Sequence, residues 1–428
     1  MSAEGTPIFR DGSPPTPIGP EIHLFLSGGT SRSALGGVGL IHALVDGDRW
    51  ARVSRIVSVS GGSMLNGALL ADPADDDPRP AANALAHRLV RDRLRWYATP
   101  TRTAATVALF AALIASLGLV GAVVGVVPGP AWLSSGGIAL ATGLLLPPVV
   151  ITVARWCGRT WFGDVVGVVT GTGAAKLVDQ KATRQHLFCA SGLSSAVPYY
   201  FWAGGDEPSI AWGEPVQDDY SIVTAAIASG SLPGLGSVRA PHRFRSETLV
   251  DGGLLGIFGQ QIDDPFQRDP DGVLREATLR SEAALCGGAM RVCLDAGRHN
   301  TVGSAVLSRL TSVSLIYTLV RWVKSSLEAT YVNDLSDWEG NELLRLCPDH
   351  PASTVSHDQV ADALTALGAE VGRLGLFNLT GDRAAATIAA GYVNATRWID
   401  DSLDAAALAE RLAAVDASLG WGSRCAEA

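Results

Sequence analysis

The stretch "SRIVSVSGGSMLNG", residues 54–67, decides the fold. An apolar run, Ile56–Val59, ends on Ser60 and two glycines, and an apolar segment of helical composition, Met64–Leu70, follows. This order predicts a buried strand, a tight turn and a helix. Two interpretations of Ser60 stay open here. It can be a reactive hydroxyl carried on a sharp turn, or an ordinary loop serine that caps the helix.

A second unit of the same kind lies just before this one. The short apolar strand Ile22–Leu26 turns through Ser27, Gly28 and Gly29 into a helix expected over Ala34–Val45. Two strand–turn–helix units in succession predict a βαβ arrangement with a parallel sheet. Because the carboxyl ends of parallel strands share one edge of the sheet, both glycine-containing turns should lie on that edge.

Further strands are expected between residues 186 and 297, over 186–195, 199–203, 246–256 and 290–297. Between them, "SIVTAAIASGSLPGLGSV" (221–238) predicts a helix that breaks at Pro233 and Gly234. The third of these strands runs into Asp251, which two glycines follow. After 301 the sequence predicts several helical stretches, among them 307–335 and 405–419.

The segment 103–154 carries no charged residue. It is long enough for two membrane spans, expected over 104–127 and 131–154, with "PGP" (128–130) as the turn between them. Arginines flank both outer ends, which predicts that both ends face the cytoplasm. The alternative is a pair of buried core helices. The sequence therefore favours a transmembrane helical hairpin over 103–155 and a location in the inner (plasma) membrane, with the catalytic domain cytoplasmic.

Composition narrows the classes of function. The chain has 428 residues, is 47% hydrophobic and has a formal net charge of −9, which argues against nucleic acid as a partner. Its 6 cysteines show no metal-ligand spacing, so no metal and no cofactor are expected. The abundance of Ala, Gly and Arg fits a bacterial protein. The polar, Pro- and Gly-rich segment 1–19 predicts a flexible leader.

The two turns contain residues suited to acyl transfer. Ser60 would be the nucleophile, and the small neighbours Gly61 and Gly62 would let a substrate approach it. The amides of Gly28, Gly29 and Thr30 can form an oxyanion hole for the tetrahedral intermediate. Arg32 would either add positive charge beside this loop or bind an anionic head group of the substrate.

A serine nucleophile needs a base within hydrogen-bond reach. None of the eight histidines stands at a strand end beside an acidic partner, and His299, after "LDAG", is the one retained as an alternative. Asp251 is the favoured base, provided that partial burial raises its proton affinity. A plain tight turn at Asp251 and Gly252 is the structural alternative.

Together these motifs resemble the patatin-like phospholipases, which combine a "GGGxRG" loop, a "GxSxG" serine turn and a "DGG" or "DGA" turn. Here they read "SGGTSRS" (27–33), "SVSGG" (58–62) and "VDGG" (250–253), and "AAIASGSLPG" (225–234) resembles the segment before the family's aspartate. The resemblance implies a Ser60–Asp251 dyad without histidine. Thr30, Ser33 and Ser58 depart from the family's glycines.

The resemblance also implies an α/β fold of three layers with a central, mainly parallel sheet, interrupted here by the expected hairpin. We expect a catalytic domain in two segments, 20–100 and 160–300, and a mostly helical region, 301–428, packed against it. The predicted function is a membrane-anchored serine acyl hydrolase, a phospholipase or lipid esterase. Its partners would be a lipid ester, the bilayer, and a second copy or a regulatory protein. A non-catalytic scaffold or lipid sensor is the alternative, because of Thr30 and Ser58.

Overall fold

The structure is a computed structural model of the whole chain. It describes residues 21–29, 31–72, 76–90, 163–173, 175–193, 195, 197–205, 208, 213–216, 219–231, 238–242, 245–254, 290–295, 342–345, 381–400 and 402–420. The expected leader 1–19, the hairpin 103–155, Thr30, His299 and the stretch 307–335 lie outside these residues.

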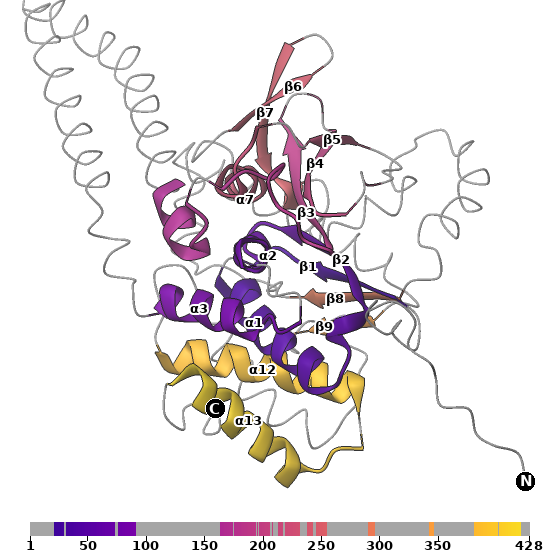
Figure 1. The fold of residues 1–428 in the computed structure, drawn as a ribbon, viewed down its shortest axis with the longest axis vertical. Helices are drawn as coiled ribbons and strands as arrows, with labels where there is room; N and C mark the ends of the chain where they lie inside the picture. Colours follow the sequence, from indigo (N-terminus) through magenta and orange to yellow (C-terminus); the bar gives the residue numbers. More distant parts are fainter. Residues whose placement is uncertain are drawn as a thin grey trace, which may run out of the picture.

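One mixed sheet of nine strands organises the described part of the chain (Figure 1). The strands are β1 (Ile22–Leu26), β2 (Val53–Val59), β3 (Gln185–Gly192), β4 (Pro198–Ala203), β5 (Glu214–Val216), β6 (Val238–His242), β7 (Arg245–Asp251), β8 (Met290–Asp295) and β9 (Glu342–Arg345). Their order is β5-β4-β3-β2-β1-β8-β9, and β7 pairs with both β3 and β6. The neighbours from β3 to β9 run parallel, whereas β4 and β7 are antiparallel to β3.

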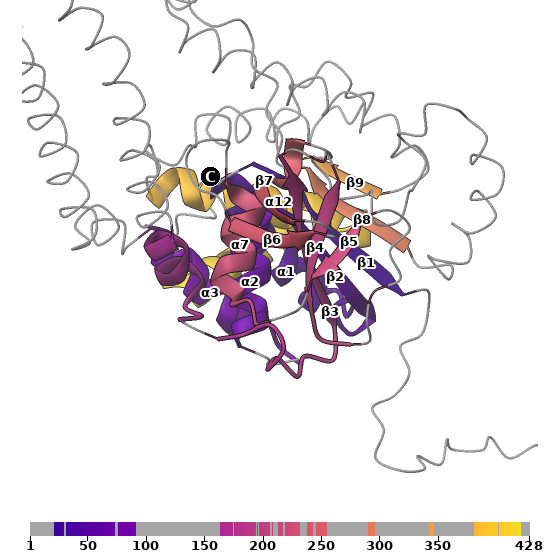
Figure 2. The ribbon, with the colours of Figure 1, turned by 90° about the horizontal axis from the view of Figure 1, so that it is seen from above.

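The described α-helices are α1 (Ser31–Asp46), α2 (Gly62–Ala71), α3 (Arg79–Val90), α7 (Ile222–Gly230), α12 (Gly381–Ile399) and α13 (Ala405–Leu419), and residues 163–170 are also helical. Figure 2 shows the labelled helices gathered on one side of the sheet. The connections β1–α1–β2 and β2–α2–α3–β3 both step in the same direction across parallel strands. Because such crossovers are right-handed, their helices fall on the same face.

The predicted strands and turns are found close to their expected bounds. Helices α1 and α2 begin earlier than expected, at Ser31 and Gly62, because each glycine-containing turn passes directly into its helix. The helix that was expected to break at Pro233 and Gly234 spans Ile222–Gly230, so it ends three residues before the proline. The sequence named no strand after 301, but β9 (342–345) extends the central sheet beside β8.

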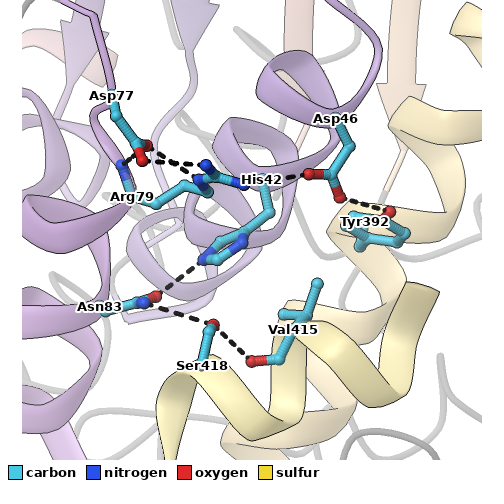
Figure 3. Close-up of polar contacts among 8 residues, drawn as sticks. All are labelled: His42, Asp46, Asp77, Arg79, Asn83, Tyr392, Val415 and Ser418. Carbon is cyan, nitrogen blue, oxygen red and sulfur yellow. Dashed lines mark hydrogen bonds and ion pairs between the residues drawn. The ribbon is translucent and has the colours of Figure 1, made fainter. Parts of the chain in front are cut away.

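Helix α12 joins the first and last parts of the chain. A Cβ added at Gly391 would lie 2.0 Å from the carbonyl oxygen of Gly36, so the backbones of α12 and α1 touch. Nearby, Tyr392 donates to Asp46 (2.8 Å), and a chain of hydrogen bonds runs from His42 through Asn83 to Ser418 of α13 (Figure 3). Burial lowers the pKa of His42, so this imidazole is neutral in the packed interface.

The predicted location in the plasma membrane is contradicted. Among the helices that the structure describes, none is long and apolar enough to cross a bilayer. The prediction depended on the uncharged segment 103–154, which lies outside the described residues, so the inserted hairpin has no structural support. Low charge over fifty residues was the signal, and by itself it does not separate a span from a buried helix.

Candidate active site

Ser60 occupies a strained turn between β2 and α2. Its backbone φ is +51°, and among the described residues other than glycine only Asp48 shares a positive φ. A side chain in this left-handed region costs free energy, and such residues gather at functional sites. Gly61 follows as the N-cap of α2, with φ −59°. The turn leaves Ser60 half-buried, while both glycines behind it are buried.

The packing of Gly62 explains why the turn needs a glycine there. A Cβ at this position would lie 2.5 Å from the carbonyl oxygen of Leu26 and 2.7 Å from its Cβ. Leu26 is the last residue of β1, and it pairs with Ser58 of β2. The N-terminus of α2 therefore sits directly against the end of β1, which places the Gly28–Gly29 turn and Ser60 on one edge of the sheet, as predicted.

Strand β3 brings Asp251 to the same place. Cys189 of β3 pairs with Val59, the last residue of β2, and the next residue, Ala190, pairs with Asp251, the last residue of β7. The other side of β3 is occupied by β4. Strands β2 and β7 thus lie along the same side of β3 and run toward each other, so that their carboxyl ends meet.

At this junction the Ser60 hydroxyl lies near enough to the Asp251 carboxyl group to influence its pKa. Burial raises the pKa of Asp251 to about 6, although the Gly253 N–H and the Ser60 hydroxyl oppose that rise by favouring the ionised form. The Gly253 amide donates to Oδ1 at 2.8 Å. Only 5% of Asp251 is exposed. The carboxyl group is therefore a stronger base than an exposed aspartate, and it is still ionised at neutral pH.

Gly252, the first glycine after Asp251, is required by packing as well. A Cβ there would lie 2.3 Å from the carbonyl oxygen of Cys189. The chain can therefore turn from β7 into the short helical turn Gly252–Leu254 only if this residue has no side chain. Asp251, Gly252 and Gly253 are all buried, and the hydrogen bond from the Gly253 N–H to Asp251 is also the contact of a tight turn, so the two interpretations of Asp251 are compatible.

The end of α7 holds the backbone of both residues. The Ser60 N–H donates to the hydroxyl of Ser229 at 3.0 Å and to its carbonyl oxygen at 3.1 Å. The Asp251 N–H donates to the carbonyl oxygen of Ser231 at 2.7 Å. The amide of Ser60 is therefore occupied and is unavailable to a substrate oxyanion.

Ser58, which stands where the family motif has a glycine, belongs to a buried polar network. Its hydroxyl donates to the Leu187 carbonyl (3.0 Å) and accepts from the Asn66 amide (2.8 Å). The other end of the Asn66 amide contacts His186 Nδ1 (2.7 Å), whose pKa burial lowers to about 3. Ser63 lies between Ser58 and Ser229, at 3.1 Å and 2.8 Å from their hydroxyls. The replacement is thus accommodated.

The remaining predicted site residues are placed only in part. Gly28 is buried and Gly29 half-buried at the end of β1, and the carbonyl of Gly29 accepts from the N–H of Arg32 (3.2 Å). Arg32 is the second residue of α1 and is half-buried. Thr30 and the alternative base His299 are outside the described residues. Within those residues, no group of three or more acidic, His or Cys side chains could hold a metal ion.

Sequence reasoning missed the residues beneath the serine: Ser229, Ser63, Asn66 and His186. The small-residue run "ASGS" (228–231) is interpreted in the sequence only as part of a helix and of the family resemblance. The feature that could have drawn attention to this run is a pair of serines at the end of a helix. By composition alone, such a pair indicates a helix cap.

Comparisons with known proteins complete the description of the site. No family model matches the chain, and no curated protein matches it in sequence. Human GIVD cytosolic phospholipase A2 is similar in structure, with a TM-score of 0.42 and 10% identity over 94% of this chain; the chain spans 63% of the human protein's length. VipD from Legionella pneumophila has a TM-score of 0.34 and 11% identity over 89% of this chain and 67% of its own. Likenesses this low carry no functional argument, so function has to be inferred from the site.

Proposed function

We propose that the chain is a serine acyl hydrolase of the patatin-like type, acting on lipid esters. The observation that carries the proposal is Ser60, held at a positive φ at the junction of strand ends where Asp251 is buried with a raised pKa. A strained turn that presents a serine, next to a carboxyl group with a raised pKa, is an arrangement suited to nucleophilic catalysis. The lipid class of substrate rests on the motif resemblance in the sequence.

The proposed chemistry needs no third residue. Ser60 Oγ attacks the ester carbonyl carbon while its proton passes to Asp251, and the tetrahedral intermediate forms. As that intermediate collapses, Asp251 returns the proton to the leaving alcohol, and the acyl group stays on Ser60. A water molecule then attacks the acyl-enzyme, with Asp251 again accepting a proton, which releases the carboxylic acid and restores Ser60.

The oxyanion needs amide donors other than that of Ser60, because Ser229 occupies that N–H. In our proposal the amides of Gly28, Gly29 and Thr30 take this role, and Arg32, at the start of α1, binds the anionic part of the substrate. Donors fixed by the fold are effective because they need no reorganisation as charge develops. Gly61 leaves room for the acyl group beside the serine, whereas Gly62 acts by letting α2 pack against Leu26.

Hydrolysis of a short-chain nitrophenyl ester and of a phospholipid in mixed micelles tests the proposal. The variant Ser60→Ala should lower both rates by about a thousandfold or more. Ser54→Ala is the matched control. Ser54 lies at the opposite end of β2, and its hydroxyl donates to the Glu21 carboxylate. Equal rates for Ser60→Ala and wild type would refute the mechanism. If the protein hydrolyses the nitrophenyl ester but not the phospholipid, the proposed substrate class is refuted and the proposed mechanism is not.

The non-catalytic scaffold remains the competing interpretation. It was motivated by Ser58 and Thr30, and the hydrogen bonds of Ser58 give that residue a structural reason for its presence. No described feature favours the scaffold. Folded wild-type protein without any esterase activity would nevertheless support it.

A further inference from the structure

The buried end of α7 contacts both members of the proposed dyad through their backbones. Ser229 accepts the Ser60 N–H through its hydroxyl and its carbonyl, and Ser231 accepts the Asp251 N–H through its carbonyl. Both serines are fully buried, with 0% of each exposed. The two serines of the segment 229–231 therefore connect the end of β2 to the end of β7.

The carbonyl contacts belong to the main chain, and any residue could supply them. The hydroxyl of Ser229 is different, because it is a side-chain acceptor for the amide of a residue in a disfavoured conformation. A positive φ persists only where surrounding contacts hold it, and the Ser60 N–H is the group whose direction φ sets. From this contact we propose that Ser229 is a positioning residue that holds the Ser60 turn in its reactive conformation. This inference rests on the proposed function for its catalytic consequence.

Neighbouring polar groups hold the Ser229 hydroxyl in turn. Ser63 Oγ lies 2.8 Å from it and 3.1 Å from Ser58 Oγ, and with one proton Ser63 can donate to only one of them at a time. Ser58 is anchored on the Leu187 carbonyl and on Asn66. The acceptor of the Ser60 amide is therefore part of a buried network that extends across β2 to β3. A buried, satisfied network of this kind gives a rigid geometry.

The variant Ser229→Ala removes the hydroxyl and leaves both carbonyls. We expect kcat for a short-chain ester to fall about tenfold or more while KM changes less than about threefold, because the turn is misplaced and the substrate contacts are kept. Ser229→Thr retains the hydroxyl and should recover most of the lost rate. Thr387→Val is the control, since Thr387 is equally buried and its hydroxyl donates a hydrogen bond to the Arg383 carbonyl within α12.

A measurement that does not depend on catalysis decides the proposal even if the chain proves inactive. Amide hydrogen exchange at Ser60 should be about fivefold faster in Ser229→Ala than in wild type, with the exchange of α12 amides unchanged. If the alanine variant fails to fold, Ser229→Cys, whose thiol is a weak acceptor, should show the same direction of change. An unaltered Ser60 exchange rate, or a kcat within twofold of wild type in an active enzyme, would overturn the role of Ser229. Absence of activity in wild type would instead overturn the proposed function.

Discussion

Ser60, directly after β2, and Asp251, the last residue of β7, lie where these two strands approach each other along one side of β3. Consecutive residues of β3 set the meeting point, because Cys189 pairs with Val59 and Ala190 pairs with Asp251. The geometry of the pair thus depends on the register of two strands on β3. Changes that act on ionisation, strain or packing at this junction should have separable effects.

The pH dependence of hydrolysis should show the ionisation of Asp251. Its pKa in the folded chain is about 6, and only the ionised carboxylate can accept the serine proton. We expect kcat/KM to rise about tenfold per pH unit below pH 6 and to level off above about pH 7. Steady-state rates on a neutral ester between pH 4.5 and 8.5 measure this. A profile that is flat across this range would contradict the assignment of the base.

Folding stability should respond to the same group in the opposite sense. Because the pKa of Asp251 rises from 3.8 to about 6 on folding, its contribution is fully present below about pH 4 and is lost as pH rises through 6. Compared with Asp251→Asn, wild type should lose about 2 kcal/mol of unfolding free energy between pH 4 and pH 8. Urea denaturation of both proteins at the two pH values checks this. If the difference in unfolding free energy between wild type and Asp251→Asn is the same at pH 4 and pH 8, the carboxyl group is not buried as described.

Backbone strain at Ser60 can be measured with two inactive variants. Glycine tolerates the positive φ of 51° whereas alanine does not, so Ser60→Gly should be more stable than Ser60→Ala by about 1 kcal/mol. Asp48, with φ 54°, provides a matched pair of substitutions away from the site, and it should show the same sign. An alanine variant as stable as the glycine variant at Ser60 would argue against a strained turn.

Packing of α2 against β1 predicts that Gly62→Ala is damaging. Its new Cβ would meet the main chain of Leu26 at 2.5 Å, which cannot move without shifting the end of β1. We expect a loss of about 2 kcal/mol of unfolding free energy and a fall in kcat. Gly67→Ala on the same helix is the control, because its Cβ would meet only side-chain methyl groups, at 3.2 Å. Equal costs for the two substitutions would contradict the close approach.

Local patterns were enough to predict the parts of the site that are local. Apolar strands that end on glycines predicted β1, β2 and β7 and the turns after them, and the two turns of the βαβ unit were expected on one edge. The lack of a suitably placed histidine favoured Asp251 as the base, and the family resemblance implied its pairing with Ser60. Nothing in the sequence near Asp251 encodes its pairing with Ala190, because strand register between distant segments depends on the assembled sheet.

The remaining differences have physical causes of the same kind. Ser229 looked like an ordinary serine at a helix end, and its contact with Ser60 exists only after α7 packs against the sheet. The strand β9 is four residues long, 342–345, which is too short for periodicity to reveal. The prediction of a membrane location was wrong. It depended on one uncharged segment, and none of the described helices is able to span a bilayer.

Covalent labelling with a fluorophosphonate, mapped by peptide mass spectrometry, tests the Ser60–Asp251 pairing most directly. The account predicts a single adduct, on Ser60, that forms on wild type at neutral pH and at least about a hundredfold more slowly on Asp251→Asn. An adduct on another residue, no adduct on folded wild type, or equal labelling rates for the two proteins would contradict it.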